Sequence, residues 1–276
     1  MNNTFETPNW KGRNIQVARS GEHFNGRMAV LDFKDNLVAA AIPGFIPFPL
    51  LQKLARSVHE ADYFGAARTA VTNRLGFYTD LQSLASEDAL TFSYFSPIWL
   101  KGPMEVARFT DWLMRDLELP LRKTATANVE FWRRINPHAQ TAGRNGSEFD
   151  WAVQSANLLL LSENEFCGTQ ASNLGINCDL SQVEMLREYV IKWGAAVHPS
   201  VERFVILYIT QCALAQSAVQ EDLPIGRAWL HIRNLTWQHL SSYTGHPLGT
   251  EFGEYCDWRC THAKLSVPNP LPAIPG

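Results

Sequence analysis

The sequence predicts an α+β fold in which helices are concentrated in the first half of the chain and strands dominate the second. Apolar residues recur at helical spacing over about residues 49–62 and again after Pro103. From residue 124 onward the chain contains runs rich in β-branched and aromatic residues, with one helical segment between them. Segregated helices and strands are typical of an α+β domain, or of a β-barrel core flanked by helices.

The composition indicates one large globular domain, because 46% of the 276 residues are hydrophobic. We expect a polar N-terminal arm over residues 1–26, a single domain over 27–266 and a proline-rich tail over 267–276. No apolar run approaches the roughly 20 residues of a membrane span, and the polar N-terminus does not resemble a signal peptide. Five cysteines, an odd number, favour free thiols and a cytoplasmic location.

The charge of the chain indicates which classes of binding partner to expect. The formal net charge is −3 and no basic block is present, so we do not expect nucleic acid to be a partner. The nine tryptophans are explained either by an aromatic-lined ligand cleft or by ordinary core packing. The oligomeric state does not follow from the sequence.

The first half of the chain is expected to hold two short apolar runs and two helices. The runs cover residues 28–33 and 37–42, and Pro49 suits the first turn of the helix that follows. Residues 63–100 are aromatic without a clear period, so we expect short strands or loops there. The second helix begins at Pro103, is amphipathic and ends before Pro120.

The second half is expected to hold four strands, over residues 125–135, 154–161, 203–210 and 228–235. The run RFVILYIT at 203–210 is apolar almost throughout, which predicts a strand buried on both faces. A helix near 180–193 is indicated by the capping-box spacing of Ser181 and Glu184 and by Gly194 at its end.

Residues 131–161 have the pattern of a strand, a polar loop and a second strand. Glu148 and Asp150 are two residues apart, and on a strand such a spacing points both side chains to one face. The pair is therefore a candidate for an oxygen-ligand metal site or a polar pocket. A register slip of one residue would turn both carboxylates outward.

The order and spacing of these features, over about residues 28–240, resemble the 2-oxoglutarate- and iron(II)-dependent oxygenases. The resemblance implies a double-stranded β-helix, a jelly-roll or cupin-like core, with flanking N-terminal helices. It puts Glu148 and Asp150 at the family's His-x-Asp pair and Gln216 near its distal histidine. Arg227 takes the position of the arginine that binds the 2-oxoglutarate carboxylate.

Both histidines of the family's two-His, one-carboxylate site are missing at these positions. Glu, Asp and Gln offer only oxygen-type ligands, whereas imidazole suits iron. The resemblance therefore implies a degenerate, non-redox protein without a cofactor that binds a small molecule or peptide, such as an accessory or metal-free cyclase-type protein in a biosynthetic pathway. Arg227 would still bind a carboxylate.

Two alternatives stay open. One is an active oxygenase that uses iron(II) and 2-oxoglutarate with unusual ligands. The other is a scaffold protein that takes up an extended peptide by strand addition at a sheet edge.

The expected binding site combines aromatic and charged side chains on or beside the predicted strands. Trp132, Arg134 and Trp229, together with Trp151 and Trp237, would line a pocket if they face inward and would pack against helices if they face outward. The expected ligand-binding residues are Trp132, Arg134, Glu148, Asp150, Gln216, Arg227 and Trp229.

Other constellations have weaker support. His138, Asp150 and His198 would form a metal set only if two loops fold inward. Cys256, Cys260, His262 and His246 have zinc-ligand types, but their spacing is irregular and free thiols are the simpler interpretation. Cys212 lies in an apolar run and is expected to be buried and inert. The sequence contains no G-x-S-x-G, P-loop or G-x-G-x-x-G motif.

Overall fold

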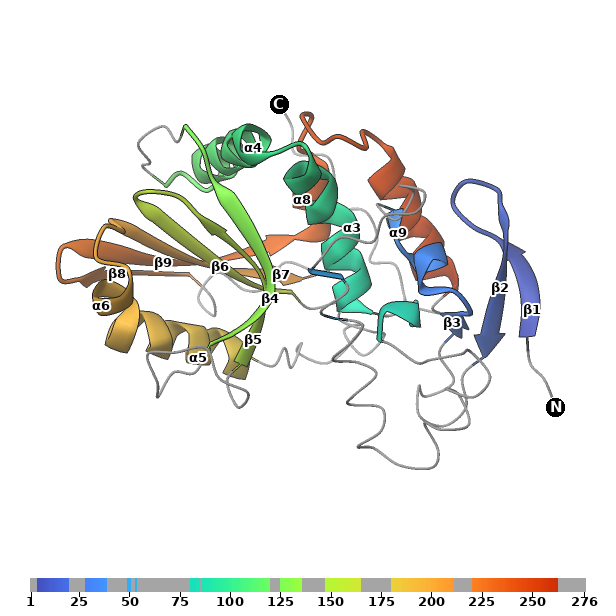
Figure 1. The fold of residues 1–276 in the computed structure, drawn as a ribbon, viewed down its shortest axis with the longest axis horizontal. Helices are drawn as coiled ribbons and strands as arrows, with labels where there is room; N and C mark the ends of the chain where they lie inside the picture. The colour runs from blue at the N-terminus through green and yellow to red at the C-terminus, as the bar shows by residue number, and fades with distance from the viewer. Residues whose placement is uncertain are drawn as a thin grey trace.

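The computed structural model describes residues 4–19, 28–38, 49–50, 53, 80–84, 86–119, 125–135, 147–164, 180–210 and 220–262. Within these ranges the chain forms a three-stranded sheet, a six-stranded sheet and the helices packed around them (Figure 1). The predicted α+β class is confirmed. No helix among the described residues is both long and apolar enough to cross a lipid bilayer.

The six-stranded sheet has the strand order β4-β5-β6-β7-β9-β8. Its strands are β4 (Asn128–Ile135), β5 (Ser147–Gln154), β6 (Leu158–Asn164), β7 (Arg203–Thr210), β8 (Glu221–Ile225) and β9 (Ala228–Thr236). The first three form an antiparallel meander, β6 and β9 each pair parallel with β7, and β8 pairs antiparallel with β9. Strand β6 is therefore where the sheet changes from antiparallel to parallel pairing. The finer prediction, a double-stranded β-helix, stays a prediction.

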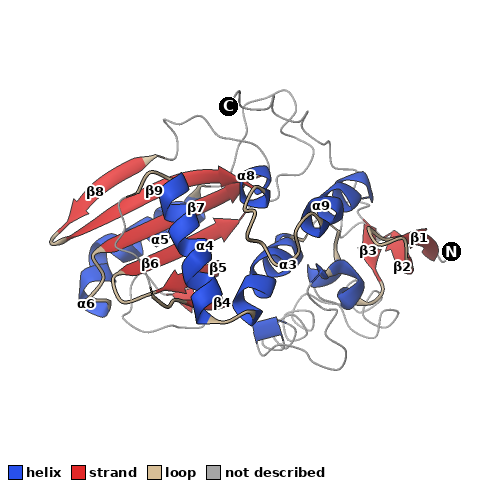
Figure 2. Cartoon of the chain, turned by 90° about the horizontal axis from the view of Figure 1, so that it is seen from above, coloured by secondary structure: helices blue, strands red, loops and turns tan. Residues whose placement is uncertain are grey.

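Helices cover both faces of this sheet. In Figures 1 and 2, α4 (Pro103–Asp116) lies over one face and α5 (Ser181–Tyr189) over the other, while α3 (Glu87–Leu100) packs beside α4. The side chains of the strands belong to two apolar clusters, one on each face of the sheet. Val205 and Leu207 lie in the cluster on the α3–α4 side, and Phe204 and Ile206 lie in the cluster on the α5 side. This alternation confirms that β7 is buried on both faces.

The helix predicted near residues 180–193 does not end at Gly194. A π-helical turn, Val190–Gly194, continues directly into α6 (Ala195–Val197). Beyond β9 follow α8 (Trp237–Ser241) and α9 (Glu251–His262), which the sequence pattern did not predict.

The N-terminal residues form a second, antiparallel sheet. It contains β1 (Thr4–Pro8), β2 (Asn14–Arg19) and β3 (Met28–Val30), and is followed by the short helices η2 (Phe33–Asn36) and η4 (Asp80–Gln82). Ile15 and Val17 of β2 are buried in the α3–α4 cluster. The expected polar arm thus contributes apolar residues to the core.

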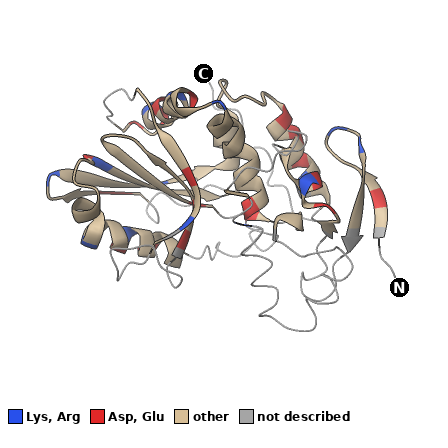
Figure 3. Cartoon of the chain, in the orientation of Figure 1, with Lys and Arg blue, Asp and Glu red and all other residues tan. Residues whose placement is uncertain are grey.

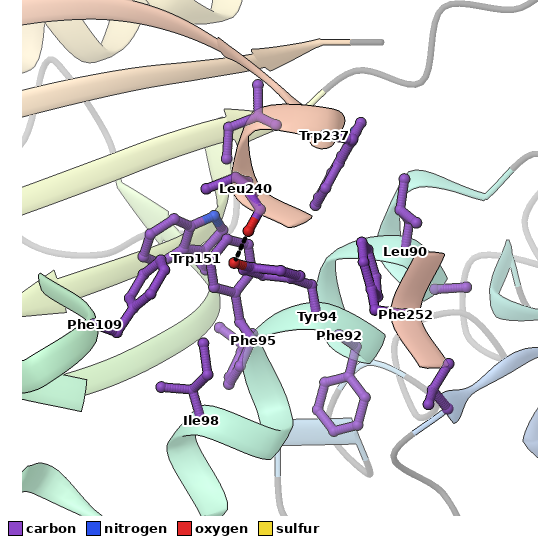
Figure 4. Packing of buried hydrophobic residues seen from close by; sticks show 14 of the residues in the cluster. Leu90, Phe92, Tyr94, Phe95, Ile98, Phe109, Trp151, Trp237, Leu240 and Phe252 are labelled. Carbon is purple, nitrogen blue, oxygen red and sulfur yellow. Dashed lines mark hydrogen bonds between the residues drawn. The ribbon is translucent and has the colours of Figure 1, made fainter. Parts of the chain in front are cut away.

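The prediction of short strands or loops over residues 63–100 is wrong for the part where α3 forms. Every residue from 89 to 98 is buried, so the helix has no polar stripe and the sequence has no 3.6-residue period to detect. Phe95 stacks on Trp151 of β5 at 3.7 Å between ring centroids, and the Tyr94 hydroxyl donates to the Leu240 carbonyl at 2.6 Å (Figure 4).

The strand predicted over residues 154–161 is also wrong in its bounds. The segment contains the end of β5, a tight turn and most of β6, and the turn is closed by the Ser155 N–H, which donates to the Leu158 carbonyl at 2.9 Å. Of the helix expected over 49–62, only residues 49, 50 and 53 are described, and they are helical. The proline-rich tail lies outside the described residues.

Candidate functional site

Charged side chains meet where the beginning of α3, the beginning of β5 and the end of β6 come together. We call this set the acid–lysine centre and define it as Lys53, Asp88, Glu148, Asp150 and Glu163. Figure 3 shows the acidic beginning of α3 in red. In open sheets with parallel strands, ligands bind outside the carboxyl ends of those strands, where the connections diverge. The centre lies at such a place, beside the end of β6.

Strand register brings two carboxylates of the centre together. Trp151 of β5 is the partner of Ser162 of β6, so the next antiparallel pair is Asp150 and Glu163. The Asn164 N–H donates to an Asp150 oxygen at 2.6 Å. One oxygen of Glu163 is shielded from solvent. Two acids therefore face each other across adjacent strands, in a partly buried setting.

A buried amide fixes the end of β6 against α3. The Asn164 side-chain N–H donates to the Thr91 hydroxyl at 2.6 Å, and its side-chain oxygen accepts from the Ser162 hydroxyl at 2.6 Å. All three residues are buried. Buried hydrogen bonds of this kind specify one relative position of the strand and the helix, so the acids of β6 and α3 keep a fixed spacing.

The backbone of β4 is irregular at Trp132, which has φ of 51°. A positive φ is rare for a bulky residue and costs on the order of 1–3 kcal/mol. The irregularity turns both Phe131 and Trp132 into the α3–α4 cluster, where a regular strand would send one of them to the opposite face. Trp132 stacks on Phe92 with an interplanar angle of 17°.

Lys53 connects three elements of the centre. Its ammonium nitrogen lies 2.8 Å from a carboxylate oxygen of Asp88 and 2.8 Å from one of Glu148, and 5.4 Å from the centroid of the Trp132 ring. Burial lowers the pKa of Lys53, but the two carboxylates outweigh burial and raise the pKa above its ordinary value. The lysine is therefore a permanent, immobilised cation at neutral pH.

The surroundings of Asp150 favour its neutral form, whereas those of Lys53 favour its charged form. Burial raises the pKa of its carboxyl well above the ordinary value, and the nearby charges of Glu163, Asp88 and Glu87 raise it further, against the Asn164 N–H that lowers it. Among the described side chains of the centre, four carboxylates face one ammonium. The described side chains of the site therefore carry an excess of negative charge, which a proton or a bound cation would reduce.

The structure divides the sequence-predicted site residues into two groups. Trp132, Glu148 and Asp150 meet at the acid–lysine centre. Arg134 is the register partner of Glu148, although its side chain lies outside the described part of the chain, and Gln216 lies wholly outside it. Arg227 and Trp229 lie at the opposite end of the sheet, in the β8–β9 turn and at the beginning of β9.

Sequence reasoning missed Lys53, Asp88 and Glu163. Lys53 had a detectable signal, because in the helix predicted from the sequence it falls on the apolar face of Leu50 and Leu54, where a charged residue needs a partner. Asp88 was hidden in a stretch that was not recognised as a helix. Glu163 lies just beyond the strand predicted over residues 154–161. That strand was placed too early in the sequence because the turn before β6 was not recognised.

The other sequence-based metal sets are not brought together. His198 lies on the α5 side, where its ring nitrogen is 3.5 Å from the Tyr189 hydroxyl, so it does not join Asp150; His138 lies outside the described residues. His246 is bonded to the Tyr94 carbonyl and His262 lies near Thr7, while Cys256 forms no disulfide with a described cysteine. Within the described ranges, no three His, Cys, Asp or Glu side chains form a ready-made metal cage.

Trp151 and Trp237 are buried in the α3–α4 cluster, so these two tryptophans pack the core and do not line a ligand pocket.

Comparison with known proteins gives no family assignment. No protein-family model matches the sequence, and no curated protein is significantly similar to it. The chemistry of the chain is therefore inferred from its own residues.

Proposed function

We propose that the chain is a non-redox hydrolase whose acid–lysine centre acts on a phosphoester with the help of a divalent cation such as Mg²⁺ or Mn²⁺. The observation that carries this proposal is the excess of carboxylates around Asp150, whose pKa is raised by burial and by Glu163, Asp88 and Glu87. Perturbed carboxyls of this kind cluster at functional sites.

The donor atoms of the centre suit such a cation. Carboxylate oxygens are the ligands that Mg²⁺ and Mn²⁺ prefer. Mg²⁺ is usually held by only one or two carboxylates, with water and substrate phosphate oxygens in the other positions, so a cage of three protein ligands is not required. Asp150 and Glu163 would hold the ion, which lowers the pKa of a bound water and polarises a phosphoryl oxygen.

The chain's own residues have separate tasks in this proposal. Asp150 and Glu163 would hold the cation, whose positive charge would stabilise both carboxylates in their ionised form. Lys53, held by Asp88 and Glu148, presents a fixed ammonium that donates to a phosphate oxygen or orients the attacking water. The Trp132 ring limits water on one side of that ammonium.

A second candidate is a metal-free protein that binds a small molecule or peptide, as the oxygenase resemblance implies. The observation that favours it is the double pairing of Lys53, which already supplies a cation to two of the acids. The double-stranded β-helix belongs to this second candidate.

The two remaining alternatives receive less support. The described acid–lysine centre offers carboxylates and an amine but no imidazole, which is a poor donor set for iron(II). Arg227, the expected 2-oxoglutarate ligand, lies in the turn before β9, at the opposite end of the sheet from the centre. Strand addition is disfavoured at β8 by Pro224, which lacks an N–H, and at β4 by the irregular Trp132.

Manganese binding and phosphoester hydrolysis test the proposal directly. Mn²⁺ binding is measured by calorimetry, and hydrolysis with bis(p-nitrophenyl) phosphate and p-nitrophenyl phosphate. Asp150→Asn should weaken Mn²⁺ binding by about 10-fold or more, and Lys53→Met should slow hydrolysis by about 100-fold or more. Asp222→Asn, which changes a carboxylate outside the centre, is the matched control.

A wild-type protein that binds no Mn²⁺ and cleaves neither ester would remove the hydrolase proposal. Binding of Mn²⁺ that is unchanged by Asp150→Asn would move the ion to another site and would equally count against it.

A further inference from the structure

The sheet face that α3 and α4 cover is open at its β8–β9 end. Seen from above, α4 crosses the sheet while the β8–β9 turn extends beyond it (Figure 2). Leu230 and Ile232 of β9 belong to the α5-side cluster, so Trp229 and His231 point to the opposite, α4 side. The Trp229 side chain is 45% exposed there.

Cross-strand neighbours form a row on this open face. Arg203 of β7 and Pro224 of β8 are the register partners of Trp229, one on each side. The rings of Trp229 and His231 are nearly parallel, at 11° with centroids 6.3 Å apart. We call Arg203, Arg227, Trp229, His231 and Arg233 the Trp229 platform.

Hydrogen bonds hold the platform in place before any ligand arrives. The Asp222 carboxylate lies 2.6 Å from Nδ1 of His231 and 2.8 Å from the Arg233 guanidinium. Arg203 lies 3.2 Å from Nε2 of His231. Because a guanidinium only donates, Nε2 accepts and the Nδ1–H donates to Asp222. Arg233 also donates to the Glu221 carbonyl at 3.1 Å, so His231 and Arg233 are each held by more than one hydrogen bond.

Among the described residues, the arginines of the platform outnumber the carboxylates that pair with them. Asp222 is shared by His231 and Arg233. Arg203 and the exposed Arg227 have no carboxylate partner among the described residues. In Figure 3 the β8–β9 turn is blue. Two guanidiniums with unused donors thus flank an exposed indole, which is complementary to a ligand that carries both a negative charge and a flat ring.

We propose that the Trp229 platform binds single-stranded nucleic acid, with a base stacked on Trp229 and phosphates bound by Arg203 and Arg227. An aromatic side chain beside basic residues on an open sheet face is the arrangement that single strands require, because every base has a π-face and every nucleotide a phosphate. An acidic peptide would satisfy the arginines but would not present a ring at each residue. A single-stranded nucleic acid gains affinity from several successive contacts, each of them weak, and an exposed surface can provide such contacts.

This inference does not rest on the proposed hydrolysis. The platform lies at the beginnings of β7 and β9, and the acid–lysine centre lies at the end of β6, which runs parallel to β7. Binding can therefore be measured with EDTA present, so that neither Mn²⁺ nor cleavage contributes to the signal.

The test is fluorescence anisotropy of a labelled 15-nucleotide single-stranded DNA of mixed sequence, in EDTA and over a series of salt concentrations. Trp229→Ala should weaken binding by about 10-fold or more, since stacking on one base contributes about 1–3 kcal/mol. Trp229→Phe, which keeps an aromatic ring, should retain most of the affinity. The double variant Arg203→Ala/Arg227→Ala should reduce the slope of log K against log salt by about 1.4, from about 0.7 for each phosphate contact.

Arg108→Ala is the control, because it removes an exposed positive charge from α4, outside the platform, where the side chain is 71% exposed. It should leave both the affinity and the salt slope unchanged. If the double arginine variant fails to fold, Arg227→Ala alone, in the exposed turn, should reduce the slope by about 0.7.

Three results would overturn the proposal. One is no binding of the strand by the wild-type protein at low salt. The second is equal binding by wild type and Trp229→Ala. The third is Trp229-dependent binding of a labelled polyglutamate peptide without binding of the strand, which would make the partner an acidic peptide.

Discussion

The two ends of the six-stranded sheet carry opposite charge in opposite surroundings. At the end of β6, carboxylates are packed beneath α3 with one lysine among them. At the beginnings of β7 and β9, Arg203 and Arg227 lie near an exposed tryptophan, on a part of the sheet face that no described helix covers. The first region gains its properties from burial, because the low dielectric magnifies each charge. The second gains its properties from exposure, which leaves donors and a ring available.

The contrast shows how little a net charge says about binding. The formal charge of −3 averages over both regions. The expectation that nucleic acid is not a partner came from the absence of a basic block in the sequence. Arg203 lies 24 positions before Arg227 in the sequence, and it comes beside the beginning of β9 only because β7 pairs with β9.

The largest expected difference between the regions concerns stability. Lys53→Met removes the cation that Asp88 and Glu148 share in a partly buried site, so we expect a loss of about 3–5 kcal/mol in the free energy of unfolding. Lys192→Met, which breaks an exposed ion pair with Glu188 on α5, should cost about 1 kcal/mol or less. Urea denaturation measures both. Similar losses of unfolding free energy in the two variants would mean that the ion pairs of Lys53 stabilise the fold no more than an exposed ion pair does.

The two regions should also respond oppositely to pH. The pKa of Asp150 is raised by burial and neighbouring acids, so its stabilising contribution is present at low pH and is lost as the pH rises through the raised value. Asp150→Asn should remove this loss and increase stability at pH 8 by about 1 kcal/mol or more. Unfolding curves of wild type and variant between pH 4 and 8 measure the effect. Parallel curves would show that Asp150 is an ordinary, ionised aspartate.

Asp222 is the natural control for that experiment. Burial raises its pKa, but hydrogen bonds from His231 and Arg233 outweigh burial and lower the pKa overall. Its stabilising contribution is therefore present above the unfolded-state value and is lost as the pH falls through the folded-state value. Asp222→Asn should therefore lower stability by a nearly constant amount between pH 4 and 8, without changing the shape of the profile there, and the difference from wild type should disappear only in more acidic solution.

The smallest expected effect is the change in stability caused by substitutions in the Trp229 platform. Trp229 is 45% exposed and Arg227 lies in a surface turn, so Trp229→Phe and Arg227→Ala should change the free energy of unfolding by about 0.5 kcal/mol or less. Thermal and urea unfolding check this. A loss of several kcal/mol would place Trp229 in the core and would remove the physical basis for a binding surface.

Residues with a strong local pattern could be predicted from the sequence. The RFVILYIT run became β7, buried on both faces, and Pro103 does begin α4. Glu148 and Asp150 were singled out because their spacing is informative on any strand. Each of these predictions depends only on neighbours along the chain.

Residues that act through distant partners could not be predicted in the same way. Nothing local indicates that Lys53 meets Glu148, nor that Glu163 faces Asp150 across a hairpin whose turn was overlooked. The fully buried α3 gave no periodicity, which hid Asp88 as well. Arg227 and Trp229 were grouped with Asp150 by family order, whereas strand pairing separates them by the length of β9.

Trp132 has a consequence for the range of sequences that this fold tolerates. Its left-handed backbone favours glycine, while its place between Phe92 and Lys53 calls for a large aromatic ring. Glycine would relax the backbone and empty the space beside the lysine, and a β-branched residue would satisfy neither demand. Position 132 is thus expected to vary far less among functional variants than the strand around it, and saturation mutagenesis with selection for folded protein would recover tryptophan there.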